Sequence, residues 1–246
     1  MSLVTFGVIY FSAKRSGLDP RLAATLGTGG AVCGVSGAIA IGGAVGAKKQ
    51  DVSVAISLVV VWAIVMIFVL PLAARALHLS TGVAGAWIGT SEFADAAVTA
   101  FTLMKVIGRD VWIGVWAFAL SLIVTTRWER TGIQSASPGG AGEIWRRFPK
   151  FVLGFLIASA IVTVISRGYD YAAYKKEVLT GFVAPLQALR TFAFFLSIGL
   201  TTRLREFVSV GARPFYAFTL GVIVNVALGF VLSTQVFNDF WNHLGQ

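Results

Sequence analysis

Residues Val52–Leu77 read VSVAISLVVVWAIVMIFVLPLAARAL, an apolar run that decides the fold class. A helix of about twenty apolar residues crosses the roughly 30 Å hydrocarbon core of a bilayer, so this run is long enough to span it. Its only charged residue, Arg75, lies near the end of the run, where Pro71 predicts a kink. We therefore expect a transmembrane α-helix here.

Similar apolar runs recur along the chain. The protein has 246 residues, of which 57% are hydrophobic and only 13% charged, and its mean hydropathy is +0.80. These values are far from those of a soluble globular domain. The runs predict about seven membrane crossings plus an opening apolar fragment, Leu3–Phe11. The expected fold class is an all-α polytopic membrane protein.

The net charge of +9 does not indicate a nucleic-acid-binding protein, because Lys and Arg lie in short clusters between apolar runs. A single cysteine, Cys33, excludes an internal disulfide, and the sequence has no CxxC or HExxH pattern. Both histidines, His78 and His243, lie at segment ends. We therefore expect no metal, no cofactor, no catalytic residues and no enzymatic activity.

A polar segment divides the chain. Residues 127–147 are rich in Gly and Ser and contain Pro138, which predicts an exposed loop. On this reading residues 1–126 hold the remainder of a first repeat and the start of a second. Residues 148–246 hold the C-terminal membrane helices.

Three interruptions fall within apolar stretches: residues 27–37, 89–95 and 197–202. Irregular backbone at membrane depth survives only beside protein or a water-filled cavity. The first and third interruptions occupy comparable places in the two halves, which is typical of transporters with inverted repeats. Half-helix N-termini at such breaks present N–H groups to an anion. The substrate-binding candidates are Thr28, Gly30, Cys33, Gly34, Ser36, Ser197, Gly199, Thr201 and Thr202. The alternative is that the glycines only allow close helix packing.

Charged residues inside apolar runs predict a coupling site. Glu92 and Asp95 are three residues apart, so a helix starting near Ser91 would place both on one face. Ionisable residues within a membrane usually mark ion or proton paths, and Arg190 could balance their charge or bind an oxyanion. The alternatives are helix capping for the carboxylates and snorkelling for Arg190. Asn225 is expected to make a hydrogen bond between helices.

The distribution of basic residues predicts the orientation. When successive spans alternate sides, most Lys and Arg residues, including Lys14 and Arg203–Arg213, collect on one side, which should be cytoplasmic. The pair Lys48 and Lys49 falls on the opposite side in this map.

Three stretches carry a family resemblance. They are LGTGGAVCGVSGAIA (Leu26–Ala40), GTSEFADAAV (Gly89–Val98) and LRTFAFFLSIGLTTRLREFVSVGARPF (Leu189–Phe215). Together they resemble the YeiH-like family of sulfate exporters, which is similar to bile-acid/sodium symporter-like transporters. The resemblance implies two inverted repeats, with crossed broken helices in a core domain. Members of that family are longer at the N-terminus, and they tend to have a histidine where this chain has Ser91.

Pattern and resemblance together predict a secondary transporter in the cytoplasmic (inner) membrane. It would move a small anion, such as sulfate or a related oxyanion, by alternating access. A proton or sodium would bind at Glu92 and Asp95, and Arg190 would balance the charge of this coupling site. The expected partners are the lipid bilayer and the anion, with no nucleic acid. A sodium-coupled organic-anion symporter is the nearest alternative, and a channel or a membrane enzyme belongs to another class.

Overall fold

The structure is a computed structural model that describes residues 1–93, 112–124, 150–166 and 211–244, together with residues 181, 185, 186, 189, 193 and 196. Every secondary-structure element in these ranges is a helix, and none of these residues forms a strand. The predicted all-α class is confirmed. The polar loop predicted at residues 127–147 lies outside the described ranges.

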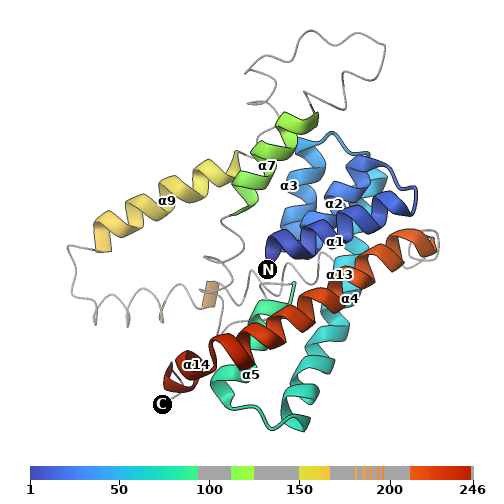
Figure 1. The fold of residues 1–246 in the computed structure, drawn as a ribbon. Coiled ribbons are helices and arrows are strands. Elements are labelled where there is room, and N and C mark those ends of the chain that lie inside the picture. The colour runs from blue at the N-terminus through green and yellow to red at the C-terminus, as the bar shows by residue number, and fades with distance from the viewer. Residues whose placement is uncertain are drawn as a thin grey trace, which may run out of the picture. The chain divides into compact units, whose positions relative to one another are not determined.

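The helices form two compact units, of which the first holds Met1–Phe148 and Glu206–Gln246 and the second Pro149–Arg205. The helices of the first unit are α1 (Ser2–Arg15), α2 (Pro20–Ala31), α3 (Val35–Ala44), α4 (Lys49–Ala76), α5 (Thr81–Ser91), α7 (Trp112–Ile123), α13 (Ala212–Val231), the π-helix η5 (Leu232–Val236) and α14 (Asn238–Leu244). The second unit contains α9 (Phe151–Ser166). The C-terminal helices therefore belong to the same unit as the N-terminal ones (Figure 1).

Helix α4 confirms the helix expected at Val52–Leu77, because it covers Lys49–Ala76 and contains Pro71 near its end. Within the described residues, α4 and the continuous stretch Ala212–Val236 are long and apolar enough to cross a membrane. Large apolar side chains on α4, such as Phe68 and Leu72, are about two thirds exposed. Such a surface suits contact with lipid.

Helices α2 and α3 form an antiparallel hairpin. Asp19 caps the start of α2 by accepting a hydrogen bond from the Arg21 N–H at 2.8 Å, and Pro20 follows as the first helical residue. The Arg21 guanidinium donates to the carbonyl oxygen of Gly46 at 3.0 Å, which joins the start of α2 to the chain just after α3. A Cβ atom added at Gly42 would lie 3.6 Å from Thr25 Cγ2, so the helix bodies also pack together. The chain therefore leaves the hairpin at the end where it entered.

This hairpin corrects the orientation map drawn from the sequence. That map treated residues 21–47 as a crossing and placed Lys48 and Lys49 opposite Lys14. Lys48 instead shares the wall of a cleft with Leu18 and Arg213, at the α1–α2 turn and the start of α13. The physical reason is that the glycine-rich interruption reverses the chain direction, so Lys48 joins the basic end of the helices.

Side-specific labelling distinguishes the two topologies. In a Cys33→Ser background, Lys14→Cys and Lys48→Cys should react with an impermeant maleimide from the same side of sealed vesicles. Leu77→Cys, at the far end of α4, should react only from the other side, because α4 is long and apolar enough to cross a membrane. Reaction of positions 14 and 77 from one side and of position 48 from the other would restore the simple crossing.

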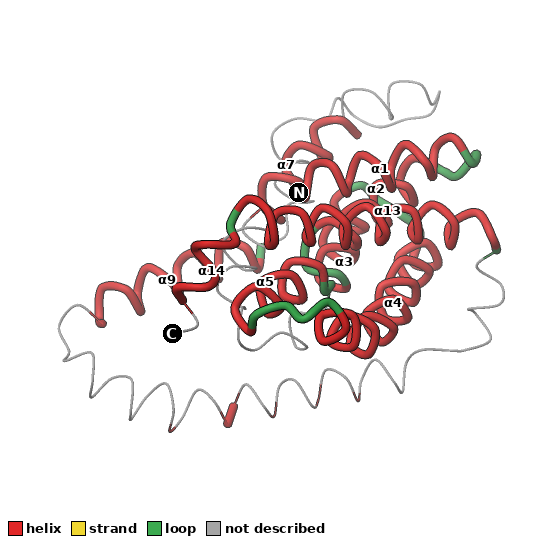
Figure 2. Tube along the Cα trace, turned by 60° about the horizontal axis from the view of Figure 1, so that its bottom comes forward, coloured by secondary structure: helices red, strands yellow, loops and turns green. Residues whose placement is uncertain are grey.

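Helix α1 packs against both α2 and α13, which also contact each other, and the three helices lie side by side in Figures 1 and 2. Ile9 on α1 is fully buried and touches Gly30 on α2 and Gly221 on α13. Phe6 packs over Gly27, where an added Cβ would lie 2.8 Å from the Phe6 ring. Small residues thus let three backbones approach closely.

Candidate functional site

The hairpin turn is built on Gly34. Its φ of 66° and ψ of −114° lie in a region that L-residues with a side chain avoid. A Cβ atom at this position would lie 2.8 Å from the Phe93 carbonyl oxygen and 2.9 Å from Val59 Cγ1. Backbone conformation and space therefore both require glycine, and the turn lies directly against the segment that follows α5.

Helix α5 ends where the second interruption was expected. Its last residue is Ser91, and Glu92 adopts an extended conformation with φ −68° and ψ 138°. The Glu92 N–H still donates to the Ile88 carbonyl oxygen at 2.9 Å, which closes the last turn. Since Phe93 touches Gly34, two interrupted helices meet at their breaks. We call Val32–Gly34 together with Ser91–Phe93 the helix-break site.

Glu92 is buried at this site, with only 1% of its surface exposed. Its Oε1 atom accepts a hydrogen bond from the Phe93 N–H at 2.9 Å. Glu92 directly follows the C-terminal end of α5, and the helix predicted to begin at this point would lie in residues 94–111, outside the described ranges. The proposed coupling role requires a carboxylate in the protein interior, and Glu92 is buried in the interior of the first unit.

Asn225 holds the broken end of α5. Its Nδ2 donates to the Ser91 carbonyl oxygen at 2.9 Å, and its Oδ1 accepts from the Thr5 hydroxyl at 3.1 Å. The last carbonyls of a helix lack intrahelical donors, and in an apolar interior each unmet one costs free energy. The helix-to-helix hydrogen bond expected of Asn225 is therefore present, and it links α1, α5 and α13.

Trp87 adds a second polar link between α5 and α13. Its indole Nε1 donates to the Val226 carbonyl oxygen at 3.0 Å. Ser91 is fully buried close to Gly229, where an added Cβ would lie 2.7 Å from the serine Oγ. This Oγ has no hydrogen-bond partner within the described part of the chain. The α5 break is thus anchored on one side by α13.

The first group of predicted substrate ligands surrounds the hairpin turn, but the residues face in different directions. The Thr28 hydroxyl is buried and donates within α2 to the Ala24 carbonyl oxygen at 2.9 Å. Gly30 faces Ile9 and Phe218, which favours the close-packing alternative for that glycine. Cys33 is buried, whereas Ser36, in the first turn of α3, is exposed. Their binding roles stay predictions.

The remaining predicted residues lie outside the described ranges. These are Asp95, Arg190, Ser197, Gly199, Thr201 and Thr202. Among the described residues, no three His, Cys, Asp or Glu side chains form a group that could hold a metal ion.

The sequence reasoning missed Thr5 as a member of the polar contact around Asn225. A threonine near the start of an apolar helix is common and carries no special signal. The Trp87 link was also missed, because an indole N–H can reach a backbone carbonyl from many positions. Asn225 itself was detectable as the one amide inside an otherwise apolar stretch.

Comparison with known proteins finds one matching family model and several related membrane proteins. A family model described as conserved hypothetical protein 698 matches residues 1–218. A UPF0324 membrane protein of Nitratidesulfovibrio vulgaris is 34% identical over 224 residues, which is 84% of this chain and 38% of the relative. A UPF0324 membrane protein of Rhodopirellula baltica is 31% identical over 225 residues, covering 84% of this chain and 40% of the relative.

A third relative, a UPF0324 membrane protein of Nitrosomonas europaea, is 30% identical over 255 residues and is covered to 52% of its length. The chain therefore spans between about two fifths and one half of these relatives. No solved structure matches it significantly.

Proposed function

Because this chain belongs to the family of conserved hypothetical protein 698, the UPF0324 membrane proteins, we propose that it is a secondary transporter of a small anion. The family resemblance predicted from the three motifs is confirmed, and the chain is an all-α membrane protein. The proposed cargo is sulfate or a related oxyanion. Movement would occur by alternating access in a cytoplasmic membrane crossed several times by the whole protein, without an enzymatic step.

The contact between two helix breaks supports this proposal most strongly. The first hydrogen bond within α3 runs from the Ala38 N–H to the Gly34 carbonyl oxygen. The N–H groups of Val35, Ser36 and Gly37 therefore have no acceptor inside their own helix. Such N–H groups, with the positive end of the helix dipole, suit an oxyanion, and broken helices in transporters present them at membrane depth.

Glu92 supplies the proposed coupling group. A buried carboxylate costs free energy unless it carries a proton or pairs with a cation. In this proposal a proton or sodium ion binds Glu92 and links the occupancy of the α3 N-terminus to the conformation of the neighbouring break. Asp95 and Arg190 remain proposed members of the same site.

The charge distribution supports the orientation of the proposal. Lys14, Arg15, Arg21, Lys48 and Arg213 all lie at the end of the first unit where α1 ends and α4 and α13 begin. Basic residues accumulate on the cytoplasmic side of membrane proteins. This end is therefore the proposed cytoplasmic end, and the hairpin enters the membrane from it.

Ligand-dependent stability tests the proposal. The purified full chain is heated with sulfate, sulfite, an alkyl sulfonate or a carboxylate at constant ionic strength, in sodium and in choline buffers. We expect one oxyanion to raise the melting temperature, because a ligand at 100 times its Kd stabilises the folded state by about 2.7 kcal/mol.

Two variants on α3 test whether the stabilisation by the anion arises at the N-terminus of this helix. Ser36→Ala removes the exposed hydroxyl in the first turn and should weaken the stabilisation severalfold. Gly43→Ala, which adds a methyl group in open space near the far end of α3, should leave it unchanged.

Absence of stabilisation by every oxyanion would contradict the oxyanion proposal, and stabilisation by carboxylates alone would favour the sodium-coupled organic-anion symporter. Unitary currents in a planar bilayer would instead identify a channel.

A further inference from the structure

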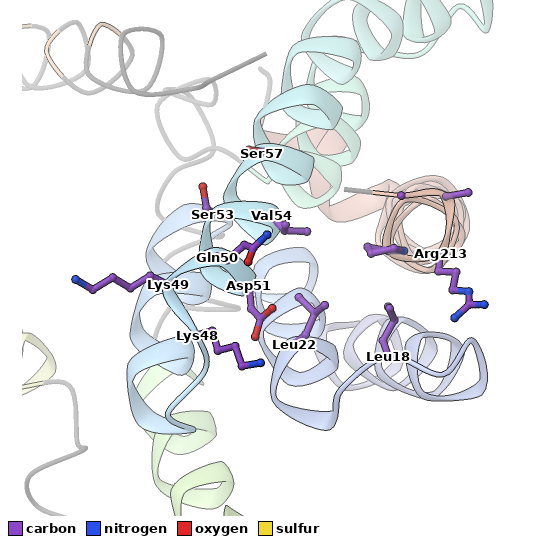
Figure 3. A pocket seen from close by; sticks show the side chains of 13 residues that line it. Leu18, Leu22, Lys48, Lys49, Gln50, Asp51, Ser53, Val54, Ser57 and Arg213 are labelled. Carbon is purple, nitrogen blue, oxygen red and sulfur yellow. The ribbon is translucent and has the colours of Figure 1, made fainter. Parts of the chain in front are cut away.

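A cleft of about 860 Å³ opens at the basic end of the first unit, and it shares no lining residue with the helix-break site (Figure 3). It lies where the α1–α2 turn, the start of α4 and the start of α13 come together. Its lining includes Leu18, Leu22, Lys48, Asp51, Ser57 and Arg213. The cleft therefore combines cationic side chains with apolar walls.

Lys48 and Arg213 place positive charge at two edges of this cleft. The Lys48 side chain extends toward Asp51 and Leu22, whereas Lys49 points away from them (Figure 3). The Arg213 guanidinium lies near the α1–α2 turn, with its Nη1 3.8 Å from a Cβ added at Gly17. Neither Lys48 nor Arg213 makes an ion pair with a carboxylate in the described ranges.

Backbone and hydroxyl donors add to the side-chain charge. Helices α4 and α13 both begin at the cleft, so the positive ends of two helix dipoles face it. Ser57, one of the lining residues, is only 6% exposed. The residue therefore adds a hydroxyl group to the wall of the cleft.

We propose that this cleft binds the phosphate group of an anionic phospholipid. Lys48, Arg213 and the α4 N-terminus contact the phosphate oxygens, and Leu18, Leu22 and Pro214 contact the glycerol and the first acyl carbons. A soluble phosphate would share the charged contacts but would leave these apolar walls unused. Basic pockets at the cytoplasmic ends of membrane helices are suited to such headgroups. This site is independent of the proposed transport function.

Native mass spectrometry of the full chain, released from neutral detergent with phosphatidylglycerol or phosphatidylcholine, tests the proposal. We expect one saturable phosphatidylglycerol adduct and weaker phosphatidylcholine binding. Lys48→Gln/Arg213→Gln should weaken phosphatidylglycerol binding about thirtyfold, since each basic residue near an anionic lipid strengthens binding about fivefold. The control Lys14→Gln/Arg15→Gln removes the same charge at the same end, outside the cleft, and should change binding less than threefold.

Asp51 provides a test of opposite sign. It is the only carboxylate among the lining residues that the structure describes. Asp51→Asn should therefore tighten phosphatidylglycerol binding severalfold, because it removes the repulsion of the phosphate. Equal weakening in both double variants, or no effect of Asp51→Asn, would overturn the proposal in favour of general surface attraction. Inorganic phosphate that displaces the lipid at a similar concentration would assign the cleft to a soluble anion and also overturn it.

Discussion

Gly34→Ala should lower the apparent melting temperature of the purified protein by about 10 °C, corresponding to roughly 3 kcal/mol or more. Two causes act together. The φ of 66° with ψ of −114° disfavours any residue with a Cβ, and the new methyl group would meet the Phe93 carbonyl oxygen at 2.8 Å. The obstacle is backbone, so it cannot move aside as a side-chain end would. The measurement is thermal unfolding monitored by tryptophan fluorescence in detergent.

Gly43→Ala is the matched control for this variant. It lies nine residues further along, in α3, and its added methyl group meets no atom within 4 Å. Because Ala is the better helix former, this change should be neutral or stabilise the protein by up to about 1 kcal/mol. Equal melting temperatures for the two variants would show that the turn at Gly34 does not have this geometry.

Glu92→Gln should abolish the dependence of anion transport on pH or sodium in proteoliposomes, so that the rate is flat across the range where the parent protein responds. A glutamine keeps an oxygen in the place of Oε1, which can still accept from the Phe93 N–H. It cannot carry the negative charge that binds a proton or cation. Stability should therefore change by no more than about 1 kcal/mol.

Asp239→Asn serves as the comparison for Glu92→Gln, since Asp239 is an exposed carboxylate on α14. It should leave the pH or sodium dependence of transport unchanged. A Glu92→Gln protein that keeps its normal dependence would remove Glu92 from the coupling role. A Glu92→Gln protein that fails to fold would instead show that the carboxylate is needed for stability, and both melting curves are recorded for this reason.

Much of the helical architecture could be predicted from hydropathy. The span at α4, the cap formed by Asp19 and Pro20, and the interruptions within residues 27–37 and 89–95 all follow local signals. Local sequence signals do not determine the direction that the chain takes after an interruption. The return of α3 along α2 depends on small residues such as Gly37 and Gly42 meeting the opposite helix, which is a tertiary contact.

The sequence predicted individual residues of the helix-break site but not the contact between its two segments. Glu92 and Gly34 were named from charge and glycine content, and the structure brings the two interruptions together through Phe93. The sequence alone could not show that Phe93 forms this contact, because an apolar residue in an apolar run has no distinguishing pattern. It also could not separate Gly30, which packs on Ile9 and Phe218, from glycines at the turn itself.

The reversal at Val32–Gly34 has a consequence for biosynthesis. Helices α2 and α3 rise only about 18 Å and 15 Å, so neither is long enough to stop translocation as an independent membrane anchor. The contacts that close the tip come from Val59 and Phe93, which are synthesised after the hairpin itself. The tip of the hairpin therefore gains these contacts only after α4 and the residues that follow α5 have been synthesised. Its packing is completed from segments made later than the hairpin itself.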